Sequence, residues 1–237
     1  MPELYKVGGC VRDKIMGVKP KDIDYVFINQ IDNDIDKSYE GMINYLKENN
    51  YKIFLETKEC LTIRAKNEDN IVSDFVLGRK EIEYEPDTRK PKCVPGSLYD
   101  DLVRRDFTIN AIAEDKDGKL YDFFNGLEDI NKKILRTPLD PSISFNDDPL
   151  RLIRAMRFKI TKGFTFNDEL KDAFNNNIFW DKLSKVVSKE RIRDELYKCF
   201  SYNTVATIKF ISELNDYQVS VLFDNHLWLK PTFEKTK

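Results

Sequence analysis

The chain has 237 residues, of which 41% are apolar and 34% charged, and 39 Lys and Arg face 41 Asp and Glu for a net charge of −2. This composition excludes intrinsically disordered and collagen-like chains, and the balanced charge gives no bulk indication of a nucleic-acid partner. No stretch approaches the roughly 18 uninterrupted apolar residues of a membrane helix, and the N-terminus lacks a signal-peptide pattern, so we expect a cytoplasmic protein without membrane contact.

Patterns in the first third of the chain predict alternating strands and helices. A strand at Leu4–Val7 is followed by a short helix that Gly17 closes, and residues 38–48 have helical spacing. Further strands are expected at Asp22–Asn29, Tyr51–Leu55, Leu61–Ala65 and Ile71–Leu77. Residues 80–97 contain three prolines and a glycine, which predicts a long loop.

The second half of the chain changes its periodicity. After a helix near 98–104, short pieces are expected at Thr108–Ala113 and Leu120–Phe124. From about residue 147 the apolar residues follow helical spacing. Further helices are expected at 168–176, 188–200 and 204–214. The chain is therefore predicted to be mixed α and β first and all-helical afterwards, with a boundary near Thr137–Ser144.

The scarcity of histidine and paired cysteine restricts the possible chemistry. The chain has one histidine, His226, and four scattered cysteines without a CxxC pair. Catalytic triads, His-ligated metals, zinc sites and disulfide frameworks are therefore not expected. Catalysis would have to use carboxylates, cationic side chains and oxygen-bound metal ions.

Two neighbouring motifs suggest a nucleotide and a metal. Gly8 and Gly9 lie between a predicted strand and helix, where backbone amides can approach a phosphate, and Arg12 can add a charge-assisted bond to a triphosphate. For the glycine pair taken alone, a plain tight turn is the better explanation. Asp22 and Asp24 are two apart on a predicted strand, so both carboxylates would project from one face and suit Mg²⁺. The alternative is an exposed pair on an edge strand.

Other polar residues could complete such a site. Asp74 lies in an apolar strand, and a neighbouring strand could bring it beside Asp22 and Asp24 as a third catalytic carboxylate; a solvent-facing position is the alternative. Arg105, Asp106 and Asn110, which follow Arg104, could position sugar and phosphate oxygens, although a surface salt bridge and a turn would also fit.

A basic segment follows near the start of the helical part. Asp148 and Arg151 are three apart at a predicted helix start and offer an acceptor beside a forked donor, which can read the edge of a base, while Arg154 and Arg157 could reach phosphates. In the alternative, Asp148 only caps the helix. We interpret the charged helix that begins near Ser188 as a scaffold that braces the preceding helices.

Five motifs stand in a fixed order, and together they resemble a known family. GGCVRDKIMGVKPKDIDYV, RRDFTINAIA, DFFNGLEDI, NDDPLRLIRAMRF and SKERIRDEL are similar to motifs A to E of the class II tRNA nucleotidyltransferase (CCA-adding enzyme) and bacterial poly(A) polymerase family. The resemblance implies an α+β nucleotidyltransferase head with the DNA polymerase β-like fold over residues 1–138, an all-α neck at 139–200 and a truncated helical body at 201–237.

The resemblance also implies roles for individual residues. Asp22 and Asp24 would hold Mg²⁺, and Asp148 with Arg151 would pair with cytosine or adenine. Contacts to the triphosphate and sugar are implied for Gly8, Gly9, Arg12, Arg105, Asp106, Arg154 and Arg157. The loop at 80–97, with Arg89-Lys90-Pro91, would help the pocket switch from C to A.

Two features depart from the family pattern. Asp147 replaces the usual Glu before Asp148, and the chain stops at Lys237, where family members continue into a tail that grips tRNA. We therefore expect RNA to be held differently, or by a helper or a second copy of the chain, as in a minimal or phage-encoded enzyme.

The expected function is Mg²⁺-dependent transfer of nucleotides from CTP and ATP to the 3′ end of tRNA. Alternatives are the addition of C alone, of the terminal A alone or of a poly(A) tail. An RNA-binding module without catalysis and a transferase that modifies proteins or small molecules also stay open.

Overall fold

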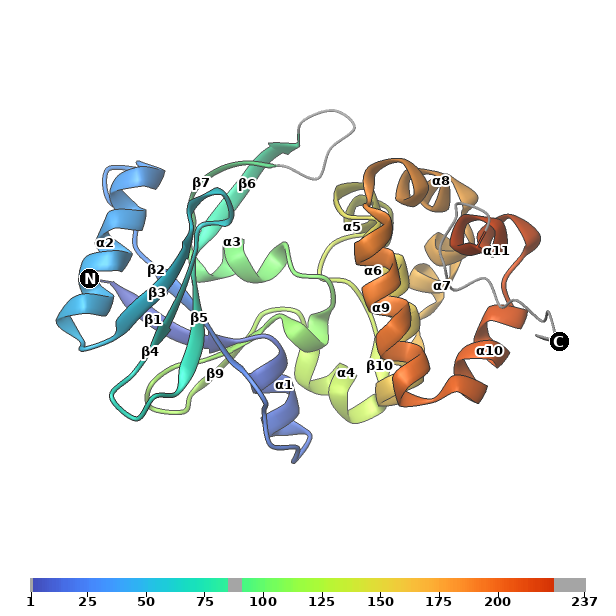
Figure 1. The fold of residues 1–237 in the computed structure, drawn as a ribbon, viewed down its shortest axis with the longest axis horizontal. Coiled ribbons are helices and arrows are strands. Elements are labelled where there is room, and N and C mark those ends of the chain that lie inside the picture. The colour runs from blue at the N-terminus through green and yellow to red at the C-terminus, as the bar shows by residue number, and fades with distance from the viewer. Residues whose placement is uncertain (1, 85–90, 224–237) are drawn as a thin grey trace, which may run out of the picture. The chain divides into compact units, whose positions relative to one another are not determined.

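The computed structural model describes residues 2–84 and 91–223 (Figure 1). These residues divide into two compact units, one formed by 2–84, 91–132 and 136–139, and the other by 133–135 and 140–223. We call them the head and the helical unit. The combination of an α/β head and a helical region confirms the predicted fold class.

The head contains a seven-stranded sheet in the order β3-β4-β5-β2-β1-β8-β9. Its strands are β1 Glu3–Val7, β2 Ile23–Ile28, β3 Lys52–Thr57, β4 Thr62–Lys66, β5 Val72–Leu77, β8 Ile112–Glu114 and β9 Leu120–Asp122. Only β2 and β5 pair in parallel among these strands. All five strands predicted before residue 80 are thereby confirmed, although β2 begins at Ile23. Asp22 therefore lies in the bend before the strand and not on it, because the chain still has to turn after Pro20.

Helices cover both faces of this sheet (Figure 1). Helix α2, Ile35–Glu48, packs Met42 and Leu46 against Phe27 of β2 on one face. On the other face, Leu98 and Leu102 belong to a second core cluster with strand residues such as Val26. They come from α3, Leu98–Val103. Because side chains alternate along a strand, Asp24 shares the α3 face with Val26.

Shorter elements connect these layers. Helix α1, Gly9–Ile15, follows β1 and ends before Gly17, as the glycines indicate. The remaining pieces of the head are the 3₁₀ turns η1 Lys58–Cys60 and η2 Thr108–Asn110 and the helix α4 Gly126–Lys132. The sequence patterns did not predict α4.

A hairpin occupies part of the segment that was predicted to be a loop. Strands β6, Arg79–Tyr84, and β7, Pro91–Pro95, pair antiparallel, so the loop prediction for 80–97 is wrong for these residues. Two of the three prolines that suggested a loop, Pro91 and Pro95, lie at the ends of β7, where proline is tolerated in a sheet. Arg89 and Lys90, predicted to belong to a flexible loop, lie outside the described residues.

The helical unit is built from seven helices within its described residues. They are α5 Pro141–Asp147, α6 Leu150–Lys162, α7 Asp168–Asn175, α8 Asn177–Val186, α9 Lys189–Tyr202, α10 Thr204–Ser212 and α11 Asp216–Phe223. A two-residue parallel ladder joins β10, Ile134–Leu135, to β11, Thr165–Phe166, so this part is not purely helical as predicted. The short helices α5, α8 and α11 were not predicted from the sequence.

The core of the helical unit centres on α6. Ile153 and Met156 are fully buried on this helix, which α9 packs against, so the predicted scaffold role of α9 is confirmed. Trp180 of α8 is also fully buried, and its Nε1 donates a 2.7 Å hydrogen bond to the carbonyl oxygen of Phe174. No helix within residues 2–84 and 91–223 has the length and apolar character of a membrane span.

Candidate active site

Paired glycines and two arginines meet where β1 passes into α1. Gly8 has a φ of +73°, a conformation that favours glycine, and a Cβ added there would lie 3.0 Å from Nη1 of Arg105. A Cβ added at Gly9 would lie 3.5 Å from Nη2 of Arg12. Two guanidinium groups therefore lie against the glycine turn, which makes this corner of the head suited to an anion.

Arg12 is held by a network that contains two other predicted site residues. Its Nη1 donates to Oδ1 of Asn110 at 2.5 Å, and its Nε and Nη2 donate to Oδ1 of Asp13 at 2.9 and 2.8 Å. Asn110 in turn donates from Nδ2 to Oδ1 of Asp106 at 2.9 Å, and the Phe107 N–H donates to the same oxygen at 2.9 Å. Because Arg12, Asp106 and Asn110 are all buried, this network fixes the orientation of the Arg12 guanidinium.

The predicted carboxylates lie on the neighbouring strands. Asp24 of β2 stands opposite Asp74 of β5, and Asp74 stands opposite Arg64 of β4. Arg64 binds both carboxylate oxygens of Asp74, with Nε at 2.6 Å and Nη2 at 2.7 Å. The structure thus brings Asp74 beside Asp24, but it also gives Asp74 a cationic partner that the sequence analysis did not anticipate.

Burial and negative charge disfavour ionisation of Asp24. Burial raises the pKa of the Asp24 carboxyl, as do the charges of Asp74 and Asp22, while Arg105 and Arg64 offset part of this effect. Asp22 is thereby close enough to act on Asp24 even though it lies in the preceding bend. An accumulation of carboxylate charge of this kind is relieved by a bound cation.

The donor set suits a hard divalent cation. Carboxylate oxygens are ligands that Mg²⁺ prefers, and it is commonly held by one or two protein carboxylates together with substrate phosphates. Asp22 and Asp24 provide such a pair. In the described part of the chain, no group of three or more Asp, Glu, His and Cys side chains is arranged to hold a metal.

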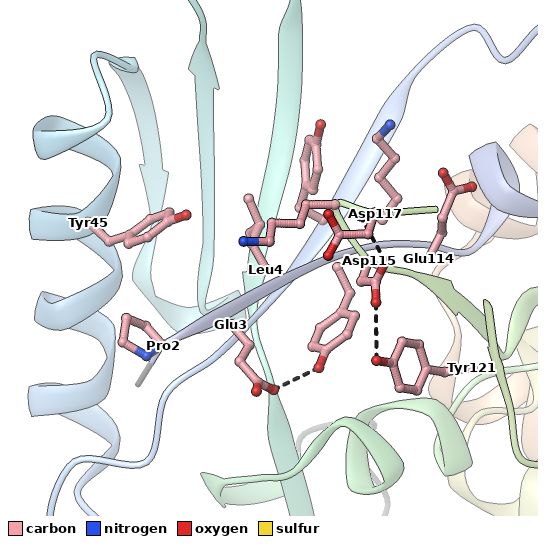
Figure 2. A pocket seen from close by; sticks show the side chains of 12 residues that line it. Pro2, Glu3, Leu4, Tyr45, Glu114, Asp115, Asp117 and Tyr121 are labelled. Carbon is pink, nitrogen blue, oxygen red and sulfur yellow. Dashed lines mark hydrogen bonds between the residues drawn. The ribbon is translucent and has the colours of Figure 1, made fainter. Parts of the chain in front are cut away.

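A cavity in the head lies elsewhere. It has a volume of about 610 Å³, and Figure 2 shows Leu4, Tyr45 and Tyr121 around it. Two hydrogen bonds join side chains that line it, from the Tyr5 hydroxyl to Glu3 at 2.7 Å and from the Tyr121 hydroxyl to Asp115 at 3.1 Å. None of the predicted site residues lines this cavity.

Asp148 and Arg151 lie at the junction of α5 and α6. Oδ1 of Asp148 accepts the Leu150 N–H at 3.0 Å, just before the first turn of α6. Arg151 is buried, and its Nη1 donates to Oγ of Ser144 at 2.8 Å and to the Ser144 carbonyl oxygen at 3.2 Å. Both side chains are therefore held in place by neighbouring atoms of the helical unit.

Arg154 and Arg157 face a carboxylate on the adjacent helix. Nε of Arg157 lies 2.5 Å from Oε2 of Glu195 on α9, and Nη1 of Arg154 lies 3.8 Å from Oε1 of the same residue. Lys198 also contacts Glu195, at 2.8 Å. Glu195 was not predicted as a partner, although its place on the charged helix of motif E could have indicated one.

Comparison with known proteins gives matches over most of the chain. Residues 4–136 match the model of the "Poly A polymerase head domain" family. A CCA-adding enzyme of Bacillus velezensis is 36% identical over 176 residues, which cover 72% of this chain and 40% of the relative. The chain spans less than half the length of the curated relatives it matches, with 40 and 47% covered in two of them.

Two solved structures are similar in fold. The Bacillus stearothermophilus CCA-adding enzyme in complex with CTP superposes with a TM-score of 0.74 at 26% identity, covering 91% of this chain and 49% of that one. A tRNA nucleotidyltransferase complexed with a primer tRNA and an incoming ATP analogue has a TM-score of 0.72 at 25% identity, covering 94% of this chain and 60% of that one.

Proposed function

The chain belongs to the family of the poly(A) polymerase head domain, and on that premise we propose that it transfers nucleotides from CTP and ATP to the 3′ end of tRNA in a Mg²⁺-dependent reaction. The observation that carries this proposal is the pairing of Asp24 with Asp74 across β2 and β5, with Asp22 and Arg105 close enough to act on the charge of Asp24. CTP and a primer tRNA with an ATP analogue are bound by two structural relatives, which supports the choice of substrates.

Asp22 and Asp24 would hold the metal ion. When bound there, Mg²⁺ would neutralise phosphate charge and lower the pKa of a coordinated hydroxyl. Asp74 stays a predicted catalytic residue, and its contact with Arg64 gives it a second explanation, since Arg64 neutralises it without any metal. The two roles are separable, because only the first requires Asp74 for transfer.

In the proposed reaction the 3′-hydroxyl oxygen of the RNA attacks the α-phosphorus of the triphosphate. The bond from this phosphorus to the bridging oxygen breaks, pyrophosphate leaves, and the hydroxyl proton passes to solvent. Arg12 and Arg105 would bind the phosphate oxygens beside the glycine turn. Asp106 and Asn110 would contribute by keeping the Arg12 guanidinium in its orientation.

We propose that the helical unit selects the base. The carboxylate of Asp148 offers acceptors and the Arg151 guanidinium offers donors, which together can match the edge of cytosine or adenine. The hydrogen bonds to Leu150 and Ser144 reduce the freedom of both side chains before a base arrives. Arg154 and Arg157 are proposed to contribute positive charge toward the phosphates, reduced by their contact with Glu195.

The test is an incorporation matrix. The purified chain is incubated with Mg²⁺, with tRNA transcripts that end at the discriminator base, at C or at CC, and with one labelled triphosphate at a time. We expect CTP to label the first two transcripts and ATP to label the third. Entry of C alone, of the terminal A alone or of long A tails would identify a partial or poly(A)-adding activity. The absence of label in every RNA would overturn the proposal.

A further inference from the structure

Helix α3 places a buried acid between two arginines. Ser97 and Asp100 form a capping box at its start, with the Asp100 N–H donating to Oγ of Ser97 at 3.2 Å and the Ser97 N–H donating to Oδ2 of Asp100 at 2.9 Å. The next residue, Asp101, is 0% exposed. Arg104 and Arg105 follow it by three and four residues, so helical geometry brings both to the same side as Asp101.

Both oxygens of Asp101 are occupied by these arginines. Oδ2 accepts from Nη2 of Arg105 at 2.9 Å and from its Nε at 3.3 Å, and Oδ1 accepts from Nη2 of Arg104. Burial alone would raise the pKa of Asp101, but the charges and hydrogen bonds of Arg104 and Arg105 hold it below its usual range. Asp101 is therefore a fixed anion inside the head.

The guanidinium of Arg105 has two edges with different surroundings. Nε and Nη2 bind Asp101, while Nη1 lies against the glycine turn, 3.0 Å from where a Cβ of Gly8 would be. Within residues 2–84 and 91–223, Nη1 has no hydrogen-bond partner. The side chain stays 19% exposed. One edge thus serves as the anchor and leaves the other for an anionic ligand at the turn.

We propose that Asp101 is a positioning residue for the triphosphate, which acts by holding Arg105 at the glycine turn before the nucleotide binds. This inference rests on the proposed function, because it assumes that the ligand of Arg105 is a nucleoside triphosphate. An arginine that is already held in place loses less rotamer freedom on binding, so the ion pair raises the affinity for the nucleotide.

A second buried acid of the head provides the control. Asp129 is 1% exposed and accepts from Oγ1 of Thr108 at 2.6 Å and from Nη2 of Arg136 at 3.1 Å. It resembles Asp101 in burial and in having an arginine partner, but within residues 2–84 and 91–223 neither Thr108 nor Arg136 is hydrogen-bonded to Gly8, Gly9 or Arg105. The variant that removes its charge therefore shows how much CTP binding changes when a buried ion pair is broken without any change at the glycine turn.

The experiment compares the affinity for CTP, measured by calorimetry with Mg²⁺ and without RNA, among the intact chain and the variants Asp101→Asn, Arg105→Ala, their combination, and Asp129→Asn. We expect Asp101→Asn to weaken binding about tenfold, as for the loss of one charge-assisted hydrogen bond. The double variant should bind no more weakly than Arg105→Ala, because Asp101 acts through Arg105. Asp129→Asn should bind within about twofold of the intact chain.

Several outcomes would overturn the inference. One such outcome is that Asp101→Asn binds CTP as tightly as the intact chain does. Another is that the double variant loses as much affinity as the effects of the two single substitutions multiplied together. No binding of CTP by the intact chain would also overturn it. If the chain binds CTP but labels no RNA, the proposed function fails while the affinities still decide the role of Asp101.

A measurement on the unaltered chain covers the case in which Asp101→Asn does not fold. The Nε–H resonance of Arg105, assigned by its disappearance in Arg105→Lys, should exchange slowly with water in the absence of CTP, because the proton is engaged by buried Asp101. Fast exchange, as for a solvated arginine, would contradict the positioning role.

Discussion

Replacing Glu195 by Ala should destabilise the helical unit strongly. The Glu195 side chain is 7% exposed, and its carboxylate accepts from Nε of Arg157 at 2.5 Å and from Nζ of Lys198 at 2.8 Å. Its removal leaves Arg157, which is 19% exposed, without this anion. Breaking a buried ion pair by removing one partner costs about 3–5 kcal/mol, and the lower end applies because Lys198 is 54% exposed and can turn to water.

The expected loss is therefore about 3 kcal/mol, or roughly 6–12 °C in melting temperature for a protein of this size. The assay is a thermal melt followed by far-ultraviolet circular dichroism at pH 7. Asp194→Ala provides the matched control on the same helix, since its side chain is 67% exposed, and we expect it to change stability by about 0.5 kcal/mol or less.

The same variant should respond to pH. Arg157, Lys198 and Arg154 hold the pKa of Glu195 below its ordinary value of 4.5, in spite of burial, which raises it. A lowered folded-state pKa stabilises the fold above the ordinary value and loses this effect as the pH falls through the folded-state value. The difference in melting temperature between the intact chain and Glu195→Ala should thus be largest at pH 7 and become smaller below pH 4.5. A difference in melting temperature under about 2 °C at pH 7, or a difference that becomes larger in acid, would refute the reasoning.

Three further substitutions test two residues of the head and Asp148 of the helical unit. Asp24→Asn should abolish transfer yet raise the melting temperature at pH 7, because burial and neighbouring acids raise the Asp24 pKa and so make its charged form destabilising. In melts at acid pH this gain in melting temperature should vanish below the ordinary pKa of 3.8, where Asp24 is protonated in both the folded and the unfolded chain. Gly8→Ala should cost about 1–2 kcal/mol in denaturant melts because φ is +73°, and it should weaken CTP binding by displacing Arg105. Asp148→Ala should lose about 1 kcal/mol through the missing bond to the Leu150 N–H, and it should let UTP and GTP compete in incorporation assays.

Local patterns in the sequence predicted most elements of the head. Alternation located β2 and β5, and glycines located the ends of α1. The same patterns were misleading at the hairpin of β6 and β7, because prolines that usually mark loops lie here at strand ends. Helices α8 and α11 were missed although α7 and α10, with eight and nine residues, were predicted, so helix length alone does not explain the difference.

The site could be predicted by residue type but not by partner. The identity of Asp74 as a candidate came from its apolar surroundings, whereas its ion pair with Arg64 depends on the register between two strands, which no local pattern encodes. The link of Arg157 to Glu195 likewise depends on the packing of two helices. In contrast, Asp101 stands three and four residues before Arg104 and Arg105, so helical spacing alone could have indicated that contact.

The central claim is that Asp22 and Asp24 serve metal-dependent nucleotidyl transfer. It is tested most directly by the incorporation of labelled CTP into a tRNA that lacks its CCA end, with and without Mg²⁺, by the intact chain, Asp22→Asn, Asp24→Asn and the exposed-acid control Asp36→Asn. We expect Mg²⁺-dependent label at the RNA 3′ end from the intact chain and from Asp36→Asn, and none from the other two variants. Incorporation at the level of the intact chain by Asp22→Asn or Asp24→Asn would contradict it.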